Sequence, residues 1–116
     1  MTHITQFQGK YRWLSNFWYV NVVLDGDTYP TVENAYQAAK TSDPIYRRKF
    51  QNMSPGSAKK LGRLVPDLPS DWDRHKLDIM DSLIRQKFQD PELRQKLIET
   101  GEREIFEGNT WEDTFP

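Results

Sequence analysis

The pattern of side chains changes from strand-like to helical near residue 30, and this change constrains the fold more than any other feature of the sequence. Residues 18–24 are rich in aromatic and β-branched side chains, which favour a strand. The Asp25-Gly26 pair that follows is typical of a hairpin turn, and residues 27–29 supply a short return strand. From Thr31, a good N-cap residue, the alanine-rich residues 32–40 favour a helix.

Further helices are predicted from capping residues and from the spacing of apolar side chains. Asp43 and Ser54 each precede a proline, which is tolerated at the first position of a helix. Ser70 is expected to cap a longer helix that reaches about residue 89. Its apolar stripe is predicted to consist of Leu77, Met80, Ile84 and Phe88.

The two ends of the chain add weaker signals. A last helix is expected to carry Leu93 and Leu97 one turn apart and to end near Gly101. Residues 4–7 favour another strand, and residues 103–116 favour a short strand and a loop. Strands first and helices after predict an α+β fold, mainly helical around a small antiparallel sheet, as one domain over residues 1–116.

Composition excludes several classes of protein. The 116 residues carry a formal net charge of -1, so no chain-wide attraction to nucleic acid or to an anionic membrane is expected. Cysteine is absent, which removes thiolate nucleophiles and thiolate metal sites, and there are only two histidines. No metal site, cofactor or membrane segment is predicted, and the chain is expected to be cytoplasmic.

Four functional side chains fall at helical spacing in residues 29–40. A helix would place them on one face, and that row consists of Glu33, Tyr36, Gln37 and Lys40. Val32, Ala35 and Ala39 are expected on the adjoining face, where small side chains pack inward. Spacing alone also fits a surface row, with Glu33 complementing the helix dipole and Lys40 solvated.

Two strings, Arg12-Trp-Leu-Ser-Asn-Phe17 and Tyr29-Pro-Thr-Val-Glu-Asn-Ala-Tyr-Gln-Ala-Ala-Lys40, resemble the NADAR (YbiA-like) family. Later matches in the family's order include Ala58-Lys-Lys-Leu-Gly-Arg63, Trp72 and Lys87-Phe88. The resemblance implies an N-glycosidase of α+β fold. Members of the family act on phosphoribosylamino-pyrimidine intermediates of riboflavin synthesis, and others remove ADP-ribose from guanine in nucleic acid.

The chemistry of an N-glycosidic bond suggests roles for three residues. Cleavage builds positive charge on the sugar, so a carboxylate that accepts this charge or activates water lowers the barrier, and Glu33 is the first candidate. Lys40 matches the family's terminal lysine, and a lysine with a lowered pKa attacks an opened ribose as a Schiff-base nucleophile. Asp113 is a candidate second carboxylate or a hydrogen-bonding partner for the sugar hydroxyls, with a turn aspartate as the alternative.

Substrate contacts are predicted from a second group of residues. Trp72 offers a flat face for a base, although core packing is an equal alternative. Arg12, Ser15 and Asn16 precede Phe17 and suit phosphate or ribose oxygens. Tyr36 and Gln37 complete the predicted set. Lys59, Lys60 and Arg63 are alternatives for phosphate, but a solvated basic face is favoured for them.

The C-terminal segment departs from the family pattern. Glu112 stands where glycine is expected, and Pro116 stands where a tryptophan would begin the last motif. A missing tryptophan would remove one wall of the pocket. The alternative function is therefore a non-catalytic module that binds ADP-ribose or a nucleotide. The expected partners are a sugar-nucleotide or ribosylated-base substrate and ADP-ribosylated nucleic acid.

Overall fold

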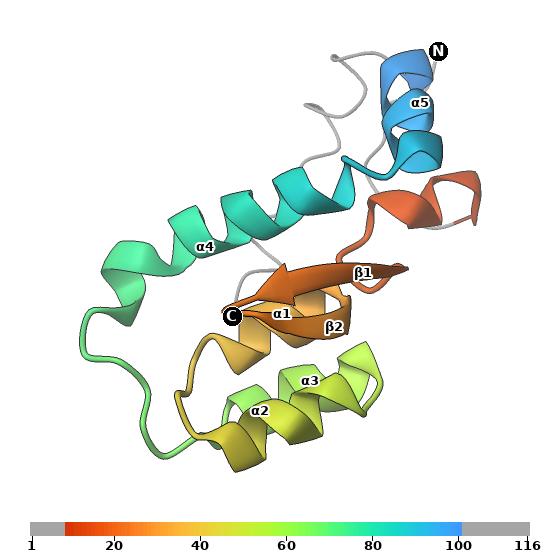
Figure 1. Ribbon diagram of the computed structural model, residues 1–116. Helices are drawn as coiled ribbons and strands as arrows, with labels where there is room; N and C mark the ends of the chain where they lie inside the picture. The colour runs from red at the N-terminus through yellow and green to blue at the C-terminus, as the bar shows by residue number, and fades with distance from the viewer. Residues whose placement is uncertain (1–8, 101–116) are drawn as a thin grey trace.

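A computed structural model describes residues 9–100 and confirms the α+β fold, which consists mainly of helices beside a small antiparallel sheet (Figure 1). In chain order the elements are a 3-10 helix η1 (Gly9–Leu14), strands β1 (Tyr19–Leu24) and β2 (Asp27–Thr31), and helices α1 (Val32–Ala38), α2 (Pro44–Gln51), α3 (Pro55–Gly62), α4 (Trp72–Lys87) and α5 (Pro91–Thr100). The strand predicted at residues 4–7, Gly101 and the C-terminal segment from 103 lie outside the described residues.

The two strands form the predicted hairpin. Val22 pairs with Tyr29, and Leu24 pairs with Asp27 next to the turn. Asp25 and Gly26 both have positive φ, at 51° and 86°, which suits a two-residue turn that follows the natural twist of the strands. The return strand is longer than predicted and leads without a loop into α1.

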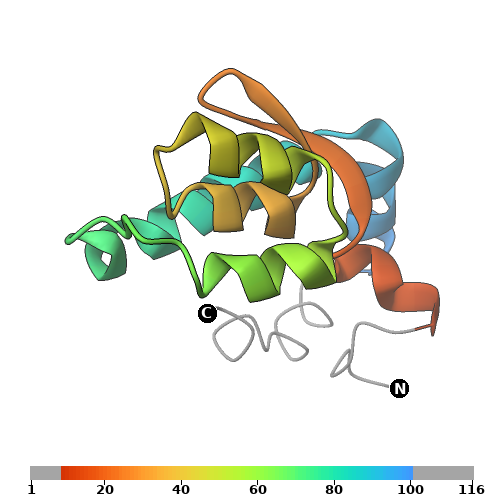
Figure 2. The ribbon, with the colours of Figure 1, turned by 90° about the horizontal axis from the view of Figure 1, so that it is seen from below.

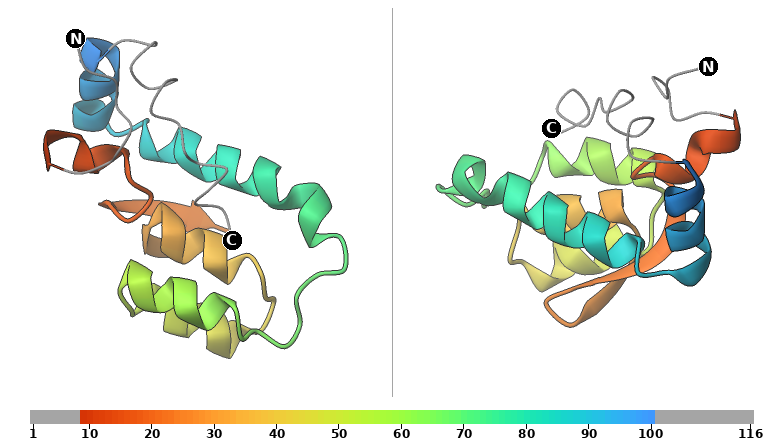
Figure 3. Two further views of the ribbon diagram at one scale, coloured as in Figure 1. Left: turned by 180° about the vertical axis from the view of Figure 1, so that it is seen from behind. Right: turned by 90° about the horizontal axis from the view of Figure 1, so that it is seen from above.

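Helix α1 lies at the centre of the fold. The hairpin and α1 form a middle layer. Figures 1 and 3 show α4 on one side of this layer and α2 and α3 on its other side. Seen from below, α1 lies between α2 and α3 (Figure 2). Every residue of α1 is buried, including its polar ones, because neighbours cover the helix on all sides.

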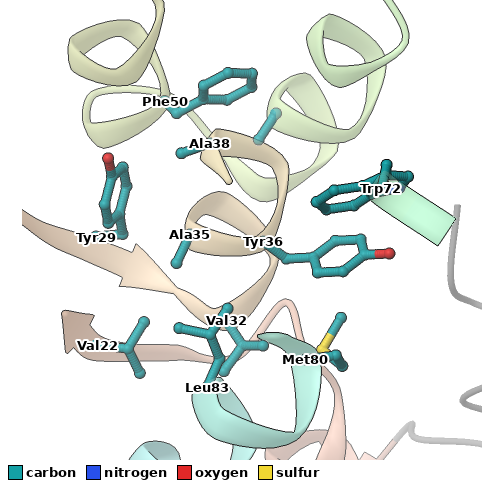
Figure 4. Packing of buried hydrophobic residues seen from close by; sticks show 11 residues of the cluster. Val22, Tyr29, Val32, Ala35, Tyr36, Ala38, Phe50, Trp72, Met80 and Leu83 are labelled. Carbon is teal, nitrogen blue, oxygen red and sulfur yellow. The ribbon is translucent and has the colours of Figure 1, made fainter. Parts of the chain in front are cut away.

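The main core surrounds α1 (Figure 4). Val32 and Ala35 face Val22 of the hairpin and Leu83 of α4, while Ala38 packs toward Phe50 of α2. Burial of these apolar side chains supplies most of the favourable free energy of folding. The sequence predicted Ala39 on the packed face, but Ala38 is fully buried and Ala39 is only half-buried.

Helix starts at Thr31, Asp43 and Ser54 are confirmed. Each side chain accepts a hydrogen bond from a backbone N–H of the first turn, and proline stands early in the two helices where it was expected. The start at Ser70 is wrong. Helix α4 begins at Trp72, and the side chain of Asp71 pairs with His75 at 3.0 Å instead of capping the helix.

The apolar stripe predicted for α4 is partly wrong. Leu77 is 55% exposed, while Met80 is buried and Ile84 and Phe88 are partly buried. The buried face of α4 consists of Trp72, Met80, Leu83 and Lys87, and the partly buried Lys76 lies in the same row at helical spacing. Because two positions of this row are lysines, the apolar spacing in the sequence does not predict it as the inner face.

A smaller core cluster joins η1 to α5. Trp13 and Leu14 pack with Leu93, and Phe88 and Leu97 border them. The rings of Trp13 and Phe88 meet edge to face at 6.2 Å between centroids. The predicted pairing of Leu93 with Leu97 on one face of the last helix is confirmed by this packing.

Candidate active site

The four-residue row of the sequence extends beyond a short helix. Glu33, Tyr36 and Gln37 lie within α1, but the helix ends at Ala38 and Lys40 lies in the turn that follows. The backbone N–H of Lys40 donates to the carbonyl of Gln37 at 3.1 Å, which continues the right-handed turn. The expectation of one helix over residues 32–40 is thus wrong at its end, and so is the alternative of a solvated surface row, because all four side chains are buried.

The carboxyl group of Glu33 is held inside the protein. Glu33 is 2% exposed, and Gln37 Nε2 donates to its Oε2 at 2.5 Å. Burial raises the pKa of Glu33, while the Gln37 hydrogen bond and the nearby Lys59 and Lys40 act in the opposite direction. A carboxyl group with a raised pKa exchanges a proton more readily near neutral pH than an exposed one does.

The ammonium group of Lys40 lies against two aromatic rings. Lys40 is 5% exposed, and its Nζ is 5.8 Å from the ring centroids of both Tyr36 and Trp72. The two rings lie 5.3 Å apart (Figure 4). Burial lowers the pKa of Lys40, Glu33 opposes this, and the cations Arg63, Lys76 and Lys59 lower it further. A lowered pKa increases the fraction of neutral, nucleophilic amine.

A hollow of about 480 Å³ lies beside Lys40. Its walls are formed by the turn after α1, the end of α3, the segment that follows α3 and the first turn and a half of α4; they consist of Lys40, Gly62, Arg63, Val65, Leu68, Trp72, Asp73 and Lys76. Three cations thus face one carboxylate, and Lys76 pairs with that Asp73 at 3.1 Å. The surplus of positive charge suits an anionic ligand, and the indole suits a ring.

A second hollow of about 560 Å³ lies between the hairpin and α4. It shares Trp72 with the first hollow, but its lining includes three carboxylates, Asp25, Asp71 and Asp78, and neither lysine nor arginine. The smaller hollow is the better candidate for the active site, because it contains Lys40 and lies next to the electrostatic pair of Lys40 and Glu33. Glu33 and Gln37 are not among the residues that line this hollow.

The remaining predicted site residues fall into three groups. Asn16 is buried and its carbonyl accepts the backbone N–H of Glu33 at 3.1 Å, while the Ser15 carbonyl accepts from Lys87. Arg12 and Phe17 are exposed, and no described contact joins their side chains to the cluster. Asp113 lies outside the described residues.

Sequence reasoning missed three positions, of which Lys76 and Gly62 line the hollow and Lys87 contacts the loop before α1. Lys76 lines the hollow, and its signal was its place four residues after Trp72 on one helix face. Lys87 is 1% exposed, although a lysine near a helix end is ordinarily read as solvated. Gly62 closely approaches Gln37, and the local sequence does not predict that contact.

The fold and the site define a small α+β protein with a buried carboxylate and a buried lysine beside a cationic, tryptophan-lined hollow. Comparison with known families places it further: residues 3–115 match the NADAR domain, and the chain belongs to this family. N-glycosidase YbiA of Escherichia coli is 35% identical over 96 residues, which cover 80% of this chain and 60% of that protein. The chain therefore spans about three fifths of the length of this relative.

Two further relatives and one solved structure agree with this placement. An N-glycosidase of Acanthamoeba polyphaga mimivirus is 37% identical over 78 residues, covering 65% of this chain and 46% of the relative. A riboflavin biosynthesis protein of Vibrio vulnificus is 28% identical over 104 residues, which make up 84% of this chain and 28% of that protein. The solution structure of the E. coli protein YbiA superposes with a TM-score of 0.70 at 32% identity, covering 87% of this chain and 65% of YbiA.

Two features are absent from residues 9–100. No helix in this part of the chain is both long and apolar enough to cross a membrane. Within the same residues, no three His, Cys, Asp or Glu side chains gather closely enough to hold a metal ion.

Proposed function

We propose that this chain hydrolyses the N-glycosidic bond of a ribosylated base, with Glu33 and Lys40 as the reacting groups. The substrate enters the hollow lined by Arg63, Trp72 and Lys76, with its phosphate toward the cations and its base against the indole. Family membership and the N-glycosidase names of the relatives support the type of bond that is cleaved.

One observation carries this proposal: a buried lysine of lowered pKa forms the wall of a cationic hollow and is electrostatically coupled to a buried carboxyl of raised pKa. Such opposite pKa shifts in neighbouring groups are typical of sites that move protons. A surface ion pair would hold both groups fully charged.

Hydrolysis without a covalent intermediate uses Glu33 as the base. The C–N bond breaks and its electron pair goes to the nitrogen of the leaving nucleobase or pyrimidine, which takes up a proton. Water adds to the sugar carbon, and its proton passes to the Glu33 carboxylate. In this route the charge of Lys40 helps to hold the phosphate and the developing negative charge of the leaving group.

A covalent route uses Lys40 as the nucleophile. When the ribose ring opens, C1 and the exocyclic nitrogen of the base form an imine. The neutral amine of Lys40 adds to C1, the base leaves as a free amine, and water then hydrolyses the lysine imine to release the sugar aldehyde. Glu33 transfers protons between the incoming amine and the departing one.

Two substrate classes fit the proposal, namely ADP-ribosyl-guanine in nucleic acid and phosphoribosylamino-pyrimidine intermediates of riboflavin synthesis. Both join a phosphorylated ribose to nitrogen. The name of the Vibrio vulnificus relative favours testing the riboflavin class first. Release of the sugar from each compound distinguishes the two classes.

Substitution of the two reacting groups tests the function. Glu33→Gln keeps the shape of the side chain and removes its proton-accepting charge, so kcat should fall about 10²- to 10⁴-fold. Lys40→Arg keeps the positive charge and cannot form an imine. Lys60→Arg, at an exposed position of α3, is the matched control and should keep the wild-type rate. Wild-type turnover in Glu33→Gln would rule out the proposed chemistry.

Trapping with borohydride separates the two routes. Reduction during turnover should fix the sugar on Lys40, giving a mass increase that peptide analysis assigns to this residue. If Lys40→Arg retains most of the rate and no adduct forms, the direct route operates. Tight binding of ADP-ribose without release of product from either substrate would identify the alternative, a non-catalytic binding module.

A further inference from the structure

The side-chain amide of Gln37 is wholly buried between α1 and α3, where it lies against Gly62. A Cβ atom added to Gly62 would stand 1.8 Å from Gln37 Oε1 and 2.7 Å from its Cδ. Real Cβ atoms do not approach other atoms this closely, so any other residue at 62 would push the amide out of its place. The absence of a side chain at Gly62 is what leaves room for this orientation.

Only one of the two polar atoms of the Gln37 amide has a hydrogen-bond partner among the described residues. Nε2 donates to Glu33 Oε2, whereas the buried Oε1 has no hydrogen-bond partner within residues 9–100. An unpaired buried acceptor costs free energy, so an amide that only filled space would be replaced at little cost by an apolar side chain. The contact that distinguishes Gln37 from an apolar residue of the same shape is the hydrogen bond to Glu33.

We propose that Gln37 is a positioning residue for the Glu33 carboxyl group and that Gly62 holds the Gln37 amide in the orientation that makes this bond. The inference rests on the proposed function, in which Glu33 reacts. It gives Gln37 a role different from the substrate contact expected from the sequence, since Gln37 is not among the residues that line the hollow. Gly62, which lines the hollow, acts here through its missing side chain.

The charged surroundings of Glu33 determine what loss of this bond would do. Lys59 on α3 and Lys40 after α1 favour the charged form of Glu33. Tyr36 on α1 also lies close to Glu33, whose negative charge raises the pKa of the Tyr36 hydroxyl. Burial disfavours the carboxylate, and the Gln37 N–H counteracts burial. Without that N–H, the Glu33 carboxyl should hold its proton to a higher pH.

The test measures the protonation of Glu33 directly. A ¹³C NMR titration of the side-chain carboxyl in the full chain, with Glu33→Gln used to assign the signal, compares wild type with Gln37→Met and Gly62→Ala. Methionine keeps the length of glutamine and removes the donor. Both variants should raise the titration midpoint of Glu33 by roughly one pH unit, since a hydrogen bond to a charged group is worth about that much.

Gly56→Ala is the matched control on the same helix. A Cβ at Gly56 meets nothing within 4 Å, so this variant should leave the Glu33 midpoint unchanged. The double variant Gly62→Ala with Gln37→Ala removes the colliding atoms. It should regain most of the thermal stability lost in Gly62→Ala while its Glu33 midpoint stays raised, which separates positioning from packing.

Two results would overturn the inference: a wild-type Glu33 midpoint in Gln37→Met, or a double variant whose midpoint returns to the wild-type value. Because the titration requires no turnover, its result is independent of the proposed function. If Glu33→Gln turned over normally, the function would fail while the measured shift stood. If Glu33→Gln were inactive and Gln37→Met titrated normally, only the positioning role would fail.

Discussion

Lys87 is the most deeply buried cation among residues 9–100. It is 1% exposed, its Nζ donates to the carbonyl of Ser15 at 2.7 Å, and it lies 5.3 Å from the ring centroid of Phe88. Burial lowers its pKa to about 7. Ser15 is adjacent to Asn16, whose carbonyl holds the first turn of α1, so Lys87 fixes the loop from which Glu33 is positioned.

This buried lysine should make folding stability depend on pH. Between pH 7 and the ordinary lysine pKa the unfolded chain binds more protons than the folded chain, so the free energy of unfolding rises with pH. The contribution of Lys87 between pH 7 and pH 9 should be about 2 kcal/mol. Urea denaturation should show this rise in wild type, and Lys87→Met should lack that part of it.

The exposed Lys60 supplies the control for this measurement. Lys60→Met should keep the full pH dependence of the wild type, because its charge is solvated in both states. Equal slopes in Lys87→Met and wild type would show that the amine of Lys87 is already solvated in the folded protein.

The residues in and around the candidate site differ in how far the sequence predicts them. Glu33 and Lys40 could be predicted because helical spacing and a family string coincide on them. Lys87 and Gly62 could not, since a lysine near a helix end has no distinctive pattern and the role of a glycine depends on which side chain faces it. Both facts belong to tertiary packing, which no local window of sequence contains.

At the scale of elements, Asn34 ties α1 to α2. Its Nδ2 donates to the carbonyls of Phe50 and Met53, each at 2.8 Å, where α2 ends. Thr31, the N-cap of α1, bonds to both the backbone and the side chain of Asn34. One buried amide thus fixes the start of the helix that carries Glu33 relative to the next helix.

Loss of this amide should destabilise the whole domain. Asn34→Leu leaves the buried carbonyl of Phe50 and the partly buried carbonyl of Met53 without their donor, so the free energy of unfolding should fall by about 3 kcal/mol. Asn52→Leu, at an exposed site where the amide bonds only within α2, should change it by less than about 1 kcal/mol. Chemical denaturation measures the free energy of unfolding of both variants. A similarly small loss in the two would show that Asn34 does not hold α1 and α2 together.

Elements were predicted best where a local interaction defines them. The starts at Thr31, Asp43 and Ser54 follow from caps that lie next to the helix in sequence. The register of α4 was not predictable in the same way, because its inner face includes Lys76 and Lys87. Lys87 is buried and Lys76 is partly buried, and a polar residue in an inner row breaks the apolar period on which sequence interpretation relies.

At the scale of the whole molecule, charge is distributed unevenly. The formal net charge is -1, yet Lys40, Arg63 and Lys76 line one hollow and Lys59 lies close enough to shift the pKa of Lys40. Like charges that repel one another in the free protein form a site that an anion would stabilise. The folded state should therefore gain stability when a phosphate-bearing sugar occupies the hollow.

Ribose 5-phosphate tests this gain without requiring turnover. A ligand that binds only the folded chain, at 100 times its Kd, adds about 2.7 kcal/mol to the free energy of unfolding, which for a domain of this size raises Tm by roughly 10 °C. The double variant Arg63→Gln with Lys76→Gln should lose most of this shift, because two of the three cations of the hollow are gone. Its matched control, Arg94→Gln with Lys60→Gln, removes the same charge from exposed positions and should keep the shift. Added salt should reduce the shift in wild type, since screening weakens the attraction. An equal shift in both double variants would place the phosphate elsewhere on the molecule.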